Sequence, residues 1–155
     1  MTRRPRPTYG FTLVELITTI VLLGIVAAFA APRFPDNRAF RERGYTDELA
    51  SSVRYAQRVA LMSGCNVRFR ITAAGYSAFQ RNSFATCRTA SAWTLPVVRS
   101  DGSALAGAAP QGVVATPATL QFTNRGRLTV NNPVAVTVGT FTLTVNPDSG
   151  IVTVP

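Results

Sequence analysis

The sequence contains no histidine and no lysine, and it has only two cysteines among its 155 residues. The absence of histidine removes the commonest general base and the commonest metal ligand. The spacing of Cys65 and Cys87 fits neither a zinc site nor a CxxC redox pair. The sequence also lacks a clustered pair of acids and a glycine-rich phosphate loop. The composition therefore predicts a protein that is not an enzyme and holds no cofactor or metal.

All positive side chains are arginines, and 16 of them against seven acids give a formal net charge of +9. From Leu49 onward nine arginines oppose only Asp101 and Asp148, a balance of nine minus two, or +7. Alternation along a strand would place each of two arginine pairs on one face; the pairs are Arg68 with Arg70 and Arg125 with Arg127. Such a face could bind the phosphates of DNA. A solvated arginine-rich surface explains the same pattern, and we favour it.

Residues 11–31 form the longest apolar stretch. Four of these 21 residues are polar: Thr12, Glu15, Thr18 and Thr19. As a helix the stretch would span about 30 Å, the thickness of a bilayer's hydrocarbon core. The basic segment MTRRPRP precedes it, so the amino terminus is expected to stay in the cytoplasm and the rest of the chain to cross the membrane. Gly24 weakens the helix locally and Pro32 interrupts its hydrogen bonds, so we predict a kink there.

Glu15 is unexpected in such a helix. A carboxylate inside a membrane-spanning helix costs on the order of 2.5–3.5 kcal/mol on insertion scales, so it usually has a partner. The only positive charge that the chain could create nearby is a new α-amino group, formed by cleavage between Gly10 and Phe11. If that amine pairs with Glu15 of a neighbouring chain, the buried pair would fix the axial register of an assembly.

A secretory signal peptide is the alternative interpretation of the same segment. Ala28 and Ala30 could be the small residues of an A-x-A cleavage site, and cleavage there would release a soluble domain. The apolar run is long for a signal peptide, however, and Glu15 would have no role in one.

The segment from Gly10 to Leu16, GFTLVEL, resembles the class III signal of type IV pilins and type II secretion pseudopilins. The resemblance implies that a prepilin peptidase cleaves after Gly10 and methylates the new amine of Phe11. It also implies that Glu15 is the assembly glutamate and that Pro32 is the helix-kinking proline of the family.

A second helix is expected beyond the apolar stretch. Residues 32–45 contain Pro35 and Gly44 and are predicted to form a linker. Thr46 can cap the helix that follows, and Gly64 suits its end. One apolar face recurs at helical spacing, through Leu49, Val53, Ala56 and Ala60.

From Cys65 the pattern changes to the alternation that is typical of strands. Residues 66–84 predict a first hairpin, and residues 100–118 predict a loop. Four later segments alternate, at 119–130, 133–138, 140–146 and 151–154, with a turn at 147–150 before the last. The expected fold is therefore α+β: a long amino-terminal hydrophobic helix, then a second helix packed on an antiparallel sheet, with the globular domain at residues 46–155.

The globular domain also resembles a smaller group within the same family. Residues 48–71, LQFTNRGRL and DSGIVTV are similar to segments of the GspH/FimT group of minor pseudopilins and minor pilins. The AAPRF junction resembles that of mannose-sensitive haemagglutinin-type pilins. If the domain lies outside the cytoplasm, Cys65 and Cys87 are expected to form one disulfide.

These inferences predict a minor pilin or minor pseudopilin. Residues 1–10 would be its leader, and the precursor would pass once through the inner membrane with residues 46–155 in the periplasm. A prepilin peptidase and other pilins or pseudopilins would be its partners, and its destination would be a pilus or pseudopilus, at the tip. Two alternatives stay open: a DNA-binding minor pilin for DNA uptake, and a secreted binding domain released by ordinary signal peptidase.

Overall fold

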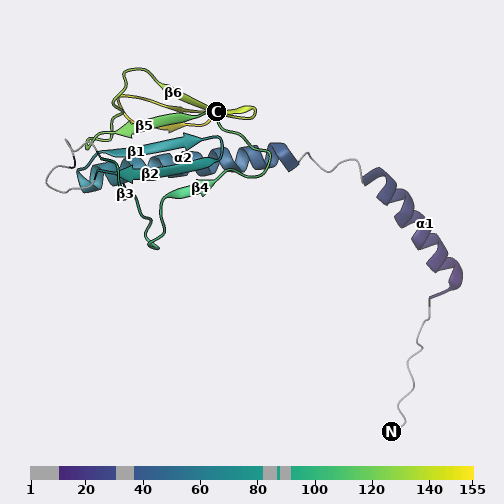
Figure 1. The fold of residues 1–155 in the computed structure, drawn as a ribbon. Coiled ribbons are helices and arrows are strands. Elements are labelled where there is room, and N and C mark those ends of the chain that lie inside the picture. Colours follow the sequence, from purple (N-terminus) through teal and green to yellow (C-terminus); the bar gives the residue numbers. More distant parts are fainter. Residues whose placement is uncertain (1–10, 31–36, 82–86, 88–91) are drawn as a thin grey trace, which may run out of the picture. The chain divides into compact units, whose positions relative to one another are not determined.

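The computed structural model describes residues 11–30, 37–81, 87 and 92–155. The chain divides into two compact units, Met1–Pro35 and Asp36–Pro155. The first unit contains helix α1 (Leu13–Ala30), and the second contains helix α2 and every strand (Figure 1). Gly10 and Pro32, two of the predicted site residues, lie outside the described residues.

Helix α1 is 18 residues long, which corresponds to about 27 Å. It continues without a break through Gly24, so an effect of this glycine on bending stays a prediction. Within the described residues, no helix is both long enough and apolar enough to cross a membrane.

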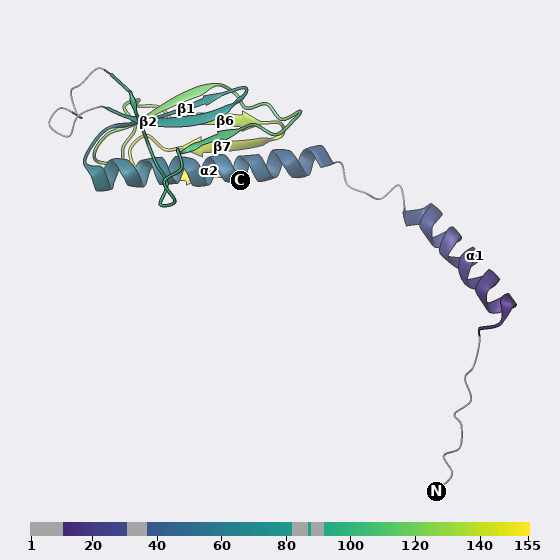
Figure 2. The same ribbon diagram turned by 60° about the horizontal axis from the view of Figure 1, so that its bottom comes forward.

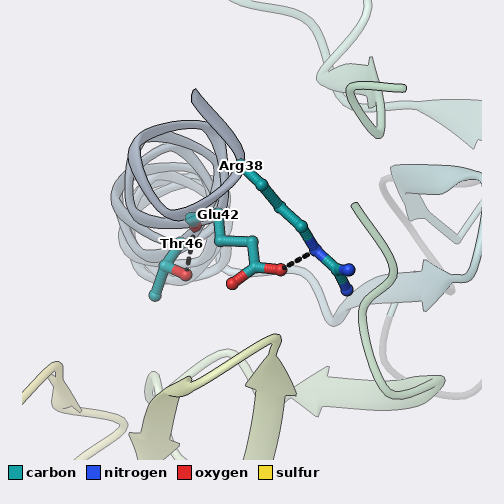
Figure 3. Close-up of polar contacts among 3 residues, drawn as sticks. All are labelled: Arg38, Glu42 and Thr46. Atoms are coloured by element: carbon teal, nitrogen blue, oxygen red, sulfur yellow. Dashed lines mark hydrogen bonds and ion pairs between the residues drawn. The ribbon is translucent and has the colours of Figure 1, made fainter. Parts of the chain in front are cut away.

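Helix α2 (Asn37–Ser63) begins nine residues before Thr46, so the predicted linker is wrong for residues 37–45. The Thr46 hydroxyl does not cap the helix; it donates to the Glu42 carbonyl oxygen at 2.8 Å, one turn back inside it (Figure 3). Arg38 Nε donates to Glu42 Oε1 at 2.9 Å across another turn. Glu42 and Tyr45 are buried. Packing of this first part of α2 on the domain offsets the roughly 1 kcal/mol that Gly44 costs inside a helix.

The first sheet has five strands in the order β3-β2-β1-β5, with β4 also paired to β2, and all pairs are antiparallel. The strands are β1 (Val67–Thr72), β2 (Gly75–Gln80), β3 (Leu95–Pro96), β4 (Ala106–Ala108) and β5 (Ala118–Phe122). The predicted first hairpin is confirmed as β1–β2. The predicted loop at 100–118 is wrong in part, because it contains β4. These small residues have no alternating pattern, and their pairing with Gly75–Ser77 makes them a strand.

The second sheet contains β6 (Val134–Val138), β7 (Phe141–Val145) and β8 (Val152–Thr153), again antiparallel. A single sheet was expected, and the late strands instead form this separate one. The predicted turn before β8 is confirmed: the Gly150 N–H donates to the Asn146 carbonyl oxygen at 2.8 Å.

The core lies between α2 and the inner faces of both sheets. Figure 2 shows α2 running along one side of the strands over most of the domain's length. The predicted apolar face of α2 is confirmed, since its four residues are fully buried. Large side chains from both sheets complete the core, including Phe69, Phe122 and Leu143. The α+β class is confirmed.

The predicted disulfide is confirmed. Cys65 and Cys87 are bonded, with an S–S distance of 2.14 Å and a Cα–Cα distance of 5.1 Å. Cys65 follows the end of α2, and Cys87 lies between β2 and β3. The bond therefore ties the segment after β2 to the carboxyl end of α2.

Candidate functional site

Two parts of the chain are candidates: the apolar helix α1 and the arginine-bearing outer face of the first sheet. At the start of α1, the Glu15 N–H donates to Thr12 Oγ1 at 3.3 Å and the Leu16 N–H donates to the Thr12 carbonyl oxygen at 3.1 Å. Thr12 is thus the N-cap, and Glu15 stands three residues on, the spacing of a capping box. The sequence analysis missed this role, although the letters TLVE carry its signature.

The other hydroxyls of α1 are satisfied within the helix. Thr18 Oγ1 lies 3.0 Å from the carbonyl oxygens of both Val14 and Glu15, and Thr19 Oγ1 donates to the Leu16 carbonyl oxygen at 2.8 Å. The Glu15 carboxylate has neither a hydrogen bond nor an ion pair within the part of the chain that the structure describes. It lies in the first turn, where the helix dipole favours a negative charge.

The surface of α1 is apolar on all sides. Eleven large apolar side chains between Phe11 and Val26 are exposed, with fractions from 51% at Ile25 to 81% at Phe11. A helix that is apolar all round belongs in a protein core or a membrane, and an exposed surface of this kind marks an interaction site.

The arginines of β1 lie as predicted. Val67, Phe69 and Ile71 are fully buried, whereas Arg68 and Arg70 point to the outer face. The prediction that a strand would align Arg125 with Arg127 is wrong. They lie in a turn closed by a hydrogen bond from the Thr123 N–H to the Arg127 carbonyl oxygen at 2.8 Å. Gly126, between them, has a φ of +73°, which ends strand alternation there.

Trp93 contacts two arginines on the outer face of the first sheet. The guanidinium carbons of Arg68 and Arg81 lie 4.4 and 4.8 Å from the centre of its ring, within the range of cation–π contacts. Burial lowers the pKa of Arg68, and the charges of Arg81 and Arg70 lower it further. The sequence analysis did not select Trp93 or Arg81, because only tertiary pairing brings them to Arg68. We call Arg68, Arg70, Arg81 and Trp93 the Trp93 cluster.

A third polar group lies between α2 and the hairpin of residues 97–105, which joins β3 to β4. The Tyr76 hydroxyl donates to Glu48 Oε1 at 2.7 Å and accepts from Ser52 Oγ at 3.0 Å and Arg99 Nη2 at 3.2 Å. Burial raises the pKa of Tyr76. These bonds attach the hairpin to α2, and we assign them a structural role.

Two known families match different parts of the chain. Residues 45–154 match the family described as type II transport protein GspH. The chain belongs to the GspH family. Residues 6–31 match the prokaryotic N-terminal methylation motif. The resemblance of GFTLVEL to type IV pilins and pseudopilins is therefore confirmed.

Known relatives agree with this assignment. The chain is 43% identical over 51 residues to the type IV narrow pilus major component PilA5 of Thermus thermophilus, a match that covers 33% of this chain and 44% of that protein. The chain thus spans less than half the length of this relative. Two crystal structures of the type IV minor pilin FimU of Pseudomonas aeruginosa share the fold, with TM-scores of 0.52 and 0.51 at 13% identity. Each match covers 73% of this chain, and 87% and 91% of the two FimU chains.

Proposed function

We propose that this GspH-family chain is a minor pilin or minor pseudopilin that a prepilin peptidase cleaves between Gly10 and Phe11. The peptidase also methylates the new α-amine of Phe11. The mature subunit enters a type IV pilus or a type II secretion pseudopilus, at the tip, and the domain beyond residue 36 faces outward. The observation that carries this proposal is the solvent-exposed apolar surface of α1, which the methylation motif overlaps.

Two successive environments suit this helix. In the precursor the apolar side chains of α1 contact lipid, with the basic leader on the cytoplasmic side and the domain in the periplasm. In the filament the same side chains contact the helices of other subunits. Because the Thr18 and Thr19 hydroxyls are satisfied inside the helix, neither environment leaves them without a partner.

Glu15 gains a partner in the filament that it lacks in the membrane. Its carboxylate costs on the order of 2.5–3.5 kcal/mol in a membrane and has no partner among the described residues. Cleavage supplies the missing cation, the α-amine of Phe11. Pairing of that amine with Glu15 of an adjacent subunit stabilises one axial stagger between helices, since any other stagger leaves both charges unpaired.

The mature amino terminus tests the proposal. The chain has no lysine, so its α-amine is the only primary amine, and reagents for amines report on it alone. Mass spectrometry of protein from membranes should find methylated Phe11 at the amino terminus. Gly10→Val should leave the precursor uncut, because a side chain obstructs the scissile bond, while Thr8→Val serves as the control and is processed. A mature chain that begins at Ala31 would show ordinary signal peptidase instead and would refute the proposal.

A further inference from the structure

The Trp93 cluster is the most basic part of the first sheet. No acid occurs between Leu49 and Ser100, so β1, β2 and β3 carry no negative side chain. Among the described residues, the ion pairs are Arg38–Glu42 and Arg43–Asp47, both within α2. Arg68 and Arg70 therefore face outward with no carboxylate partner in the described part of the chain, and Arg70 is exposed.

The cluster has the composition of a protein interface. Arginine and tryptophan are the residues that most often carry binding energy between proteins. Two guanidinium groups held against one indole ring are also ordered before a partner arrives, which lowers the entropy lost on binding. A planar guanidinium binds a carboxylate through two parallel hydrogen bonds.

We propose that the Trp93 cluster is the contact surface for an acidic neighbouring subunit, whose carboxylates bind Arg68, Arg70 and Arg81. The identity of this neighbour, a different pilin or pseudopilin in the same filament, rests on the proposed function. Charge complementarity between the two surfaces then selects the neighbour and its orientation.

A second copy of this chain does not fit the cluster. Between Leu49 and the carboxyl terminus each copy carries +7, so two copies side by side repel. Four of the five acids in the described part of the domain already have internal partners: Glu42 with Arg38, Asp47 with Arg43, Glu48 with Tyr76, and Asp101 with Ser103. A copy therefore has few carboxylates to offer, and the neighbour is a different subunit.

The first experiment uses the fluorescence of Trp93, the only tryptophan in the chain, as a reporter inside the cluster. Full-length protein in detergent micelles is titrated with poly-L-glutamate at about 20 mM salt, where surface charges are weakly screened. We expect a saturable change in Trp93 emission that is lost at high salt. A single-stranded oligonucleotide of equal charge is titrated in parallel, because a guanidinium also binds phosphate. It should bind more weakly, since two guanidinium groups already contact the Trp93 ring and leave less of it for base stacking.

Substitutions then locate the binding. Arg70→Gln leaves both contacts of Trp93 intact, and loss of one exposed carboxylate contact should weaken the interaction roughly two- to five-fold. Arg68→Gln with Arg81→Gln should weaken it by roughly five- to thirty-fold. Arg54→Gln with Arg58→Gln is the matched control, since it removes the same charge from α2 and should change affinity less than about two-fold. Circular dichroism confirms that each variant is folded.

A cross-linking experiment identifies the neighbour in filaments. Thr119 of β5 stands opposite Arg70 of β1 in the sheet register, so a photoreactive amino acid at position 119 lies beside the cluster. It should capture a different subunit with an acidic domain.

Three results would overturn the proposal: no response of Trp93 to poly-L-glutamate, tighter binding of the oligonucleotide, or cross-links to another copy of this chain. The mature amino terminus is measured independently. A methylated Phe11 together with any of these results would refute the acidic neighbour and leave the proposed function standing.

Discussion

Replacing Gly139 with alanine should loosen the first part of α2 from the second sheet. Gly139 lies in the turn between β6 and β7 and has a φ of +58°. A Cβ atom there would overlap the Glu42 carboxylate, which reaches down from α2. Glu42 is 5% exposed and accepts a hydrogen bond from Arg38 Nε at 2.9 Å (Figure 3). Alanine at 139 therefore strains the backbone and also displaces a buried carboxylate from its ion pair.

The two effects differ in size and can be separated. The left-handed conformation costs alanine about 1 kcal/mol relative to glycine. Moving the carboxylate of Glu42 disrupts its ion pair with Arg38. Because the Arg38 side chain is 64% exposed, solvent screens this pair, and its loss should destabilise the fold by only about 1–2 kcal/mol. The free energy of unfolding should thus fall by about 2–3 kcal/mol.

Gly102→Ala is the matched control. Gly102 has a φ of +81°, but a Cβ atom there meets nothing within 4 Å, so only the backbone cost of about 1 kcal/mol applies. Urea unfolding of the full-length chain in detergent, followed by Trp93 fluorescence, measures both variants. Addition of Glu42→Ala to Gly139→Ala should cost less than the sum of the single changes, because the overlap is gone. Equal destabilisation by the two glycine substitutions would refute the reasoning.

Three further predictions concern assembly, the disulfide and DNA. Glu15→Leu should insert in the membrane at least as well as wild type, because a costly carboxylate is gone, but it should fail to enter filaments. Membrane fractionation and filament purification measure the two effects. Efficient incorporation of the variant would show that Glu15 is not the assembly contact. The double variant Cys65→Ala and Cys87→Ala opens a loop of 22 residues. Its free energy of unfolding should fall by about 3 kcal/mol, which calorimetry should show as a fall of roughly 10 °C in Tm. An unchanged Tm would exclude a stabilising role for the bond. We expect the full-length chain to bind duplex DNA weakly at most. If Arg125 and Arg127 both touch phosphate, changing both to Gln should lower the slope of log affinity against log salt concentration by up to about two. No binding at roughly 50 mM salt and micromolar protein would exclude a receptor role.

Local patterns in the sequence were enough to predict most of the elements. The alternation at Val67, Phe69 and Ile71 predicts a strand with these residues inside, because neighbouring side chains on a strand point to opposite faces. The spacing of Leu49 and Val53 predicts the buried face of α2 for the corresponding reason in a helix. The GFTLVEL segment identifies the pilin family without any structure, since the whole motif lies within one short stretch of chain.

Tertiary structure alone decided the features that depend on residues far apart in the sequence. Helix α2 begins at Asn37 because Glu42 and Tyr45 find buried positions on the domain, which no local preference of a segment with Gly44 would indicate. Strand β4 exists only through its pairing with β2. The Trp93 cluster likewise forms because folding brings residues of β1 and residues of the segment between β2 and β3 to one surface. Such contacts depend on the packing of the whole domain, whereas the period of a helix or strand is set by the geometry of its own backbone.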